Sequence, residues 1–421
     1  MSSFTARLFK NGLFLREIAI LSSESSFLLQ IVDKLVNNQA LLSIDVDHLP
    51  LQIDSNRRKI IVLDSIHSGK GRSSSSDPYQ QLLKILFNSE NLNVDHDYYK
   101  TDSIDFISNF SSNLLKAIDS SNKLPVTLII ISGDTSINEF VNNLPHIPDF
   151  QNDILISVLP LGSGNALASE LNIIDPIDSI KKLISNSSKG SKLPLYNATF
   201  SDGSYLFLNP EIKVSSFNFF LIFSWCFHAS LVADSEDPSL KSKGVERFQI
   251  AANYNLNKKI QTYNCDLSIN DQQIASNSNY SYFILSAVKN LQDNFNISPL
   301  SNLLNQDLYL LLMHYNNDID GQSNNKNLLN VMNQAFNNAN HIDDTNFFKS
   351  NQLDYYKIKD YKNHNNDFQI NLKINESEKN MCRVCLDGTI IVVDSINDTQ
   401  KFVQINNSGN SYNNWNLFIL N

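Results

Sequence analysis

The chain has 421 residues, 42% of them hydrophobic, and a formal net charge of −10. This length allows two domains with ordinary cores, and the acidic balance argues against broad nucleic-acid binding, so we expect no nucleic-acid partner. No apolar run approaches the ~20 residues of a membrane-spanning helix, and the first residues do not form a signal peptide. Four cysteines in so long a chain indicate a reducing compartment, which predicts a cytoplasmic protein.

Residues 1–56 alternate apolar and polar side chains, with a helix-like stretch at residues 27–35. We predict a small antiparallel appendage here, whose role the sequence does not indicate.

Residues 57–190 alternate buried strands with amphipathic helices. Strands are predicted from residue 59, over 93–101, over 126–131 and from 153, and helices from Asp77 and over 104–118. This alternation predicts right-handed βαβ units and a doubly wound parallel α/β domain. In such a sheet ligands bind beyond the carboxyl ends of the strands, which is where Ser68, Thr101, Asp134 and Ser163 are expected to lie.

The turn at residues 132–136 follows one of these strands. Ser136 and Glu139 have the spacing of a capping box, which predicts that a helix begins at Ser136. Such a turn offers backbone N–H groups and a partial positive charge, which suit phosphate. The carboxylate of Asp134 is unusual in that setting, although in isolation a local turn hydrogen bond is the simpler interpretation.

A second stretch, residues 153–168, repeats the plan of strand, turn and helix. Gly162 and Gly164 flank Ser163, so the backbone can approach a ligand closely while the serine hydroxyl adds a donor.

Together, SGDTSINEFVNNL (132–144) and PLGSGNALA (160–168) resemble the paired nucleotide-binding motifs of the diacylglycerol kinase catalytic family, which includes sphingosine and ceramide kinases. Ser68-Gly-Lys-Gly71 is similar to a phosphate-proximal loop of that family, with Ser65-Ile66 where Asn-Pro is usual. The resemblance implies a divergent lipid kinase with a nucleotide-binding domain like those of diacylglycerol and NAD kinases.

From residue 191 to 421 the pattern changes to strands with short turns, including a hairpin signal at Asp202-Gly203. We predict an antiparallel β-sandwich domain. The apolar window 217–233 is predicted as buried strand, the Asn-rich runs 316–327 and 337–340 as loops, and residues 328–336 as a short helix between those loops.

The resemblance extends into this second half. Residues 223–236 and 241–248 are similar to the family segment with the lipid site and phosphate-binding arginines. Taken alone, Arg247 is typical of a surface ion pair, whereas the resemblance implies that it binds phosphate through its guanidinium fork. Leu386-Asp-Gly-Thr389 resembles the family's Asp-Gly-Glu on a late segment that returns toward the nucleotide, although alone it is typical of a hairpin turn.

The resemblance therefore implies roles for particular residues. It makes Asp134 the general base of an ATP- and Mg²⁺-dependent phosphotransfer to a lipid alcohol. It implies lipid contacts for Trp225, Phe227 and Ser230. It implies nucleotide contacts for Ser68, Gly69, Thr101, Gly133, Thr135, Gly162, Ser163, Gly164, Lys241, Arg247, Asp387 and Gly388. The substrate class implies peripheral association with a membrane surface. No protein metal site is expected, since Cys382-Arg-Val-Cys385 lacks a second ligand pair.

Four positions depart from the family pattern. Thr135 stands where glycine is usual and predicts either a backbone strain of ~1–3 kcal/mol or a methyl group pushed toward the phosphates. Thr389 replaces a carboxylate that would help to hold Mg²⁺. Ser230 and Val232 replace acidic residues, which argues against a protonated amine substrate but not against ceramide or diacylglycerol.

These departures leave three hypotheses open. The first is a kinase for a sphingoid base, ceramide or a related lipid, and the second is a weakened pseudokinase that binds lipid or nucleotide. The third is a soluble-substrate kinase related to NAD kinase.

Overall fold

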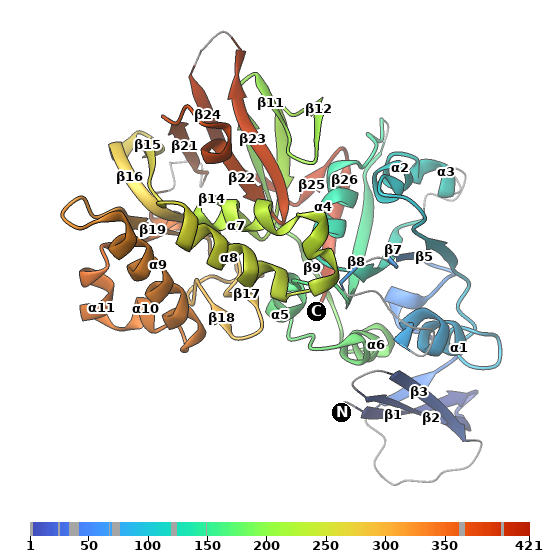
Figure 1. Ribbon diagram of the computed structural model, residues 1–421. Coiled ribbons are helices and arrows are strands. Elements are labelled where there is room, and N and C mark those ends of the chain that lie inside the picture. Colours follow the sequence, from blue (N-terminus) through green and yellow to red (C-terminus); the bar gives the residue numbers. More distant parts are fainter. Residues whose placement is uncertain are drawn as a thin grey trace. The chain divides into compact units, whose positions relative to one another are not determined.

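The computed structural model describes residues 3–23, 26–32, 42–66, 68–69, 76–118, 124–148, 150–361, 367–396 and 400–421. The chain forms two compact units (Figure 1). The first comprises Met1–Ser163, Leu171–Lys192 and Asn410–Asn421, and the second comprises Gly164–Glu170 and Leu193–Gly409. The chain therefore passes between units at 163/164, 170/171, 192/193 and 409/410.

The first unit begins with a small sheet in the order β3-β2-β1-β4. Its strands are β1 (Ser3–Lys10), β2 (Leu13–Ser23), β3 (Ser26–Val32) and β4 (Leu42–Asp45). Alternate residues such as Phe4 and Ile20 face a core that they share with α6 (Pro176–Ile184). The predicted helix is wrong for residues 27–32, because β3 pairs antiparallel with β2 along its whole length. Residues 33–35 lie outside the described residues.

The main sheet of this unit has the order β25-β26-β8-β7-β5-β6, with β9 paired to β26. The strands are β5 (Lys59–Asp64), β6 (Asp97–Lys100), β7 (Val126–Ser132), β8 (Asn152–Pro160), β9 (Gly190–Lys192), β25 (Ser411–Tyr412) and β26 (Trp415–Leu420). Pairing is parallel from β6 through β26, as β-branched, fully buried runs favour. The end of the chain thus completes the sheet that begins near residue 59.

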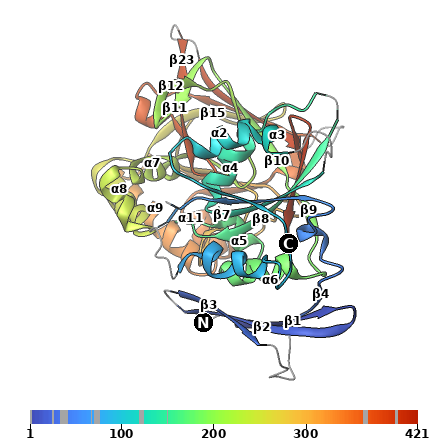
Figure 2. The same ribbon diagram turned by 90° about the vertical axis from the view of Figure 1, so that its right-hand side faces the viewer.

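Helices cover both faces of this sheet. They are a π-helical turn at Tyr79–Leu83 with α1 (Lys84–Leu86), α2 (Phe106–Ser112), α3 (Leu114–Ala117), α4 (Asp134–Asn142) and α6. Figure 2 shows α2 and α4 on one side of β7 and β8, and α6 on the other. Asp77 caps the first helical segment as predicted, accepting the N–H groups of Tyr79 and Gln80. The doubly wound parallel architecture is confirmed.

The second unit is built on one antiparallel sheet of thirteen strands. The path is β12-β11-β23-β22-β14-β16-β15-β21-β24-β10-β13, and β19 and β20 branch from β16. The ladder is continuous because β16 pairs with β15 through its first part and with β14 and β19 through its last. The predicted antiparallel region is confirmed, and its strands form a single hydrogen-bonded sheet.

The strands of the second unit are β10 (Leu195–Phe200), β11 (Gly203–Leu206), β12 (Asn209–Lys213), β13 (Ser216–Phe219), β14 (Ile222–Cys226), β15 (Tyr263–Ile269), β16 (Gln272–Ser286), β19 (Tyr309–His314), β20 (Leu353–Lys357), β21 (Gln369–Ile374), β22 (Arg383–Leu386), β23 (Thr389–Ser395) and β24 (Lys401–Gly409), with a separate hairpin of β17 (Asn290–Gln292) and β18 (Phe295–Asn296).

The second unit also carries helices α5 (Ala166–Glu170), α7 (Phe227–Ser235), α8 (Glu246–Lys258), α9 (Gly321–Phe336), α10 (Asn340–Asp343) and α11 (Thr345–Ser350). Two predictions are corrected. The apolar window is strand only as far as Cys226 and continues as α7. The first Asn-rich run is not loop throughout, because Asp320 caps α9 through the N–H groups of Gln322 and Ser323.

Among the described residues, no helix combines the length and hydrophobicity that crossing a membrane requires.

Candidate functional site

The order of strands in the parallel sheet fixes one candidate ligand position. β5 lies between β6 and β7, and the chain runs from β5 to β6 on one side before it returns to β7 on the other. The connections after β5 and β7 therefore leave in opposite directions, and in sheets of this kind ligands bind at the carboxyl edge between two such strands. Loops after β5, β6, β7 and β8 carry the predicted residues Ser68, Gly69, Thr101, Gly133, Asp134, Thr135, Gly162 and Ser163.

The loop after β5 is folded back on the ends of its neighbours. The Ser65 N–H donates to the Ile131 carbonyl oxygen at 3.1 Å, and the Ser68 N–H donates to the Ser65 carbonyl oxygen at 3.1 Å. The buried hydroxyl of Thr101 accepts the Ile66 N–H at 3.2 Å. Thr101 thus shapes this loop directly, while a nucleotide contact by Thr101 stays a prediction. Lys70, at the predicted phosphate loop, lies outside the described residues.

Gly69 brings the β5 loop against the β8 loop. It has a φ of +67°, and a Cβ added there would lie 2.5 Å from the Leu161 carbonyl oxygen. The backbone conformation and the close approach both require glycine at this position. Because Leu161 directly precedes Gly162, the two predicted phosphate loops meet within the first unit.

The turn after β7 differs in detail from the prediction. Gly133 is the N-cap, with φ −102° and ψ 179°, and α4 begins at Asp134. The predicted start at Ser136 is wrong, since the Glu139 carboxylate does not cap this helix but accepts the Ser108 N–H in α2 at 3.1 Å. Burial raises the pKa of Glu139, and the hydrogen bond from Ser108 opposes that rise.

The backbone strain predicted at Thr135 is absent. Thr135 lies in the first turn of α4, is exposed and does not have a positive φ. Asp134, one residue earlier, is partly buried at the amino end of the same helix. The partial positive charge at that end favours both a carboxylate and a bound anion.

The loop after β8 continues the same edge of the sheet. The Leu161 N–H donates to the Ser132 carbonyl oxygen at 3.1 Å, which ties this loop to the end of β7. Gly162 and Ser163 follow in the first unit, and Gly164 is the first residue of the second. The predicted glycine loop is thus a point at which the chain changes unit.

The remaining predicted residues lie in the second unit. Arg247, at the start of α8, forms an ion pair with Glu236 at 2.9 Å. Its Nε is buried and lacks a hydrogen-bond partner among the described residues, so its hydrogen-bonding capacity is not exhausted. Phosphate binding by Arg247 stays a prediction. Lys241 lies in a 3-10 turn (Pro238–Lys243), and its side chain lies outside what the structure describes.

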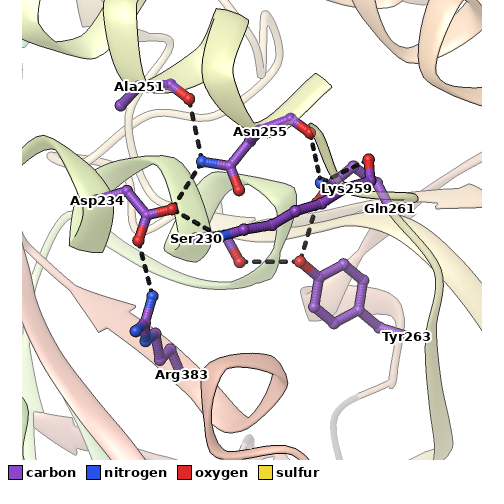
Figure 3. A network of polar contacts seen from close by, with 8 residues as sticks. All are labelled: Ser230, Asp234, Ala251, Asn255, Lys259, Gln261, Tyr263 and Arg383. Carbon is purple, nitrogen blue, oxygen red and sulfur yellow. Dashed lines mark hydrogen bonds and ion pairs between the residues drawn. The ribbon is translucent and has the colours of Figure 1, made fainter. Parts of the chain in front are cut away.

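The three predicted lipid-contact residues are buried in their own unit. Trp225 is fully buried, and its indole N–H donates to the Met381 carbonyl oxygen at 2.8 Å. Phe227 is also buried, and Ser230 Oγ lies 2.8 Å from the Tyr263 hydroxyl (Figure 3). All three side chains pack against the protein in this conformation, so lipid contact by any of them stays a prediction and would require opening of the α7 region.

Strain marks the start of α7. Cys226 has φ 61° and ψ −139°, a region close to one that only glycine adopts readily. Its thiol is fully buried, which raises its pKa well above the ordinary value and leaves it protonated at neutral pH. The sequence did not indicate this strain, because nothing in the local pattern demands a positive φ at a cysteine.

An ion cluster at the last turn of α7 holds this helix in place. The Asp234 carboxylate accepts hydrogen bonds from Lys259 Nζ at 2.8 Å, Asn255 Nδ2 at 3.0 Å and Arg383 Nη1 at 2.9 Å (Figure 3). Burial acts to raise the pKa of Asp234, but these donors and the two cations lower it overall. One carboxylate thus joins α7 to α8 and β22.

Asp387 has a local structural role. Its carboxylate accepts the N–H groups of Phe220, Leu221 and Ile222 at 2.8, 3.0 and 2.8 Å. Asp387 and Gly388 form the tight turn between β22 and β23, with φ of 48° and 92°. The hairpin interpretation describes this geometry, and nucleotide contact by either residue stays a prediction.

Sequence reasoning also missed polar residues that organise these elements. Asp64, at the end of β5, is fully buried and accepts the Tyr98 hydroxyl at 2.8 Å. Glu170, at the end of α5, binds two backbone N–H groups of the second unit. An acid at the carboxyl end of a predicted buried strand was a usable signal for Asp64, whereas the partners of Glu170 lie more than 100 residues away in sequence.

Comparison with known proteins finds a family model that is similar to part of the chain. Residues 66–193 match the family model of the diacylglycerol kinase catalytic domain. The matched segment contains β6, β7 and β8 and the loops that follow them. Over these residues the chain is therefore similar to the diacylglycerol kinase catalytic domain.

The solved structures that match this chain have low sequence identity to it. A diacylglycerol kinase from Bacillus anthracis str. Sterne is 13% identical, with a TM-score of 0.48 over 86% of this chain and 96% of that chain. An NAD kinase from Archaeoglobus fulgidus in complex with ATP is 8% identical, with a TM-score of 0.35 over 83% of this chain and 90% of that chain. No curated protein matches the sequence significantly.

Proposed function

We propose that the protein is an ATP-dependent lipid kinase that phosphorylates the primary hydroxyl of a sphingoid base, a ceramide or a related lipid. The observation that carries this proposal is the change in connection direction between β5 and β7, where the turn holding Asp134 opens α4. The family match over residues 66–193 supports the same reaction class.

Backbone groups of the loops would bind the nucleotide. Ser68 and Gly69 after β5, Gly133 and Thr135 after β7, and Gly162 to Gly164 after β8 would cradle the phosphates of ATP. Mg²⁺ would arrive with the nucleotide, whose phosphates would supply most of its ligands. When bound, the ion would neutralise phosphate charge.

Asp134 would act as the general base. Its carboxylate would take the proton of the lipid hydroxyl as that oxygen bonds to the γ-phosphorus of ATP, and the bond from phosphorus to the bridging oxygen would break, leaving ADP with the electron pair. Phosphoryl transfer needs positioning and charge stabilisation more than covalent catalysis, and a positioned base is worth ~10²–10⁴ in rate. Lys241 and Arg247 would balance the developing charge.

Neutral acceptors fit the second unit best. Ser230 Oγ pairs with the Tyr263 hydroxyl, and position 232 holds valine, so neither site supplies a carboxylate for a protonated amine. Ceramide or diacylglycerol therefore ranks above a sphingoid base. Such substrates would place the protein in the cytoplasm at a membrane surface, as a peripheral protein.

A second candidate, a pseudokinase that binds lipid or nucleotide without turnover, also has a specific observation in its favour. The Asp387 carboxylate accepts three backbone N–H groups, and Thr389 replaces the acid usual two residues later. This arrangement would leave Mg²⁺ with fewer protein ligands.

One experiment separates the candidates. Purified protein is incubated with labelled ATP, Mg²⁺ and, in separate reactions, ceramide, diacylglycerol, a sphingoid base and NAD. Labelled lipid supports the kinase, and labelled NADP would transfer the assignment to a soluble-substrate kinase. A thermal shift with nucleotide or lipid but no labelled product supports the pseudokinase.

A further inference from the structure

The glycine loop after β8 leads into a short excursion of the chain. Gly164–Glu170 belongs to the second unit, whereas the residues on both sides of it belong to the first. Within this excursion, α5 buries Ala166, Leu167 and Ala168. The segment that follows Ser163 is thus packed within the second unit.

Glu170 supplies the polar part of that attachment. Its Oε2 accepts the Lys289 N–H at 3.2 Å and its Oε1 accepts the Leu303 N–H at 3.2 Å. One carboxylate thereby binds two segments that flank the β17–β18 hairpin. Burial raises the pKa of Glu170, and these two hydrogen bonds oppose the rise.

The segments that receive Glu170 are themselves well fixed. The Lys289 carbonyl oxygen accepts the N–H groups of Ile297 and Ser298 at 3.0 and 3.2 Å. Leu303 is fully buried, directly after an isolated bridge residue, Asn302, which pairs with Asp307. Glu170 therefore attaches α5 to two segments that are themselves held by backbone hydrogen bonds and burial.

The other end of the excursion lies against the same hairpin. A Cβ added at Gly164 would lie 3.9 Å from the Leu291 carbonyl oxygen in β17. Gly164 therefore lies near β17, and Glu170, at the other end of this seven-residue segment, binds residues on either side of the same hairpin.

We infer that Glu170 is a positioning residue for the nucleotide loop: by fixing α5 to the β17–β18 hairpin and Leu303, it sets the conformation of Gly162-Ser163-Gly164. The predicted effect on Mg·ATP binding rests on the proposed function. The predicted effect on the order of the loop does not. A small loss of order in a phosphate loop is costly, since a displacement of about 1 Å can reduce a rate by about 10²-fold.

The test compares Glu170→Ala and Glu170→Gln with a matched control, Glu376→Gln, in the full-length protein. Glu376 is also a partly buried acid of the second unit with a raised pKa, and it accepts the Asn264 N–H. The glutamine variant of Glu170 retains one acceptor oxygen and should show a partial effect. This control shows how much hydrogen exchange and Mg·ATP affinity change when a comparable acid that does not contact α5 is removed.

The first readout is amide hydrogen exchange of residues 161–170, which requires no ligand. Glu170→Ala should speed exchange in this segment by about tenfold or more relative to the wild type and to Glu376→Gln. The second readout is the affinity of the protein for Mg·ATP. The KM or dissociation constant should rise about tenfold, with a much smaller change in kcat at saturating ATP.

Unchanged exchange in Glu170→Ala would overturn the inference, as would a KM that moves no more than in Glu376→Gln. Should the wild type neither bind nor hydrolyse ATP, the proposed function fails, and the exchange readout still decides the role of Glu170.

Discussion

Gly69 and Leu161 lie so close that no side chain fits between them: an added Cβ on Gly69 would be 2.5 Å from the Leu161 carbonyl oxygen. The contact joins the loop after β5 to the loop after β8 on either side of the turn that holds Asp134. The candidate phosphate site is therefore a packed junction of loops, and its shape depends on a glycine.

Gly69→Ala should disrupt this junction. The positive φ would be strained by a side chain at a cost of about 1–3 kcal/mol, and the new methyl group would also displace the β8 loop. We expect weaker Mg·ATP binding by calorimetry in addition to a lower melting temperature. Gly12→Ala is the matched control, because Gly12 has a φ of +73° but no atom within 4 Å of an added Cβ. Equal nucleotide affinity in the two variants would contradict the proposed role of the junction.

Thr135→Gly should not stabilise the protein, although glycine is the residue expected there. Thr135 lies in a right-handed helical turn and is exposed, so glycine would cost about 0.3 kcal/mol of helix stability relative to threonine, itself a weak helix former. Urea unfolding measures the difference. A gain in stability would show that the turn is strained after all.

Asp387→Ala should destabilise the second unit strongly. The substitution would leave the buried N–H groups of Phe220, Leu221 and Ile222 without their acceptor, at about 1–3 kcal/mol each before relaxation. The free energy of unfolding, from urea titration, should fall by at least about 3 kcal/mol. A variant of native stability that had lost only Mg·ATP binding would instead make Asp387 a nucleotide ligand.

Asp234→Asn should destabilise the α7 region in a pH-dependent way. The variant leaves Lys259 and Arg383 close together without their carboxylate, at a cost of about 1–3 kcal/mol at neutral pH. The pKa of Asp234 is lowered in the folded state, so its contribution is complete above the ordinary value of 3.8 and is lost as pH falls through the folded pKa. The stability difference from wild type should therefore shrink at acid pH, in urea titrations between neutral pH and about pH 3.

The control for that series is Asp394→Asn. Asp394 pairs with Lys379, whose side chain is 68% exposed, and such pairs contribute only about 0–1 kcal/mol. If Asp394→Asn lowered the free energy of unfolding as much as Asp234→Asn does, the cluster around Asp234 would contribute no more to stability than an exposed ion pair.

The sequence predicts the parallel sheet well because its signals are local. The run from Val126 to Ile131 is apolar and rich in β-branched residues, which favours a buried strand. The residues after it, 132–136, favour a turn by their own composition. The start of α4 was misplaced because Glu139 has capping-box spacing but is used by Ser108 of a different helix. Local spacing cannot reveal a competing tertiary partner.

The roles in the second unit were harder to predict for the same reason. Asp387 binds backbone groups about 165 residues earlier in the chain, and Arg383 reaches Asp234 across 149 residues. In the N-terminal sheet, residues 27–32 have apolar spacing that fits a helix, yet pairing with β2 makes them a strand. In each of these cases a partner distant in the sequence determines the structure, and a single sequence carries no direct signal for such a partner.

The most direct test of the account is Asp134→Asn in the labelled-ATP assay with ceramide and diacylglycerol. We predict labelled lipid with the wild type, a loss of turnover of at least about 10²-fold in the variant, and Mg·ATP affinity within a few-fold of wild type, because the amide keeps the shape of the turn and removes only the base. Unchanged turnover in Asp134→Asn would remove Asp134 from the mechanism, and absence of any phosphorylated lipid with the wild type would contradict the kinase proposal itself.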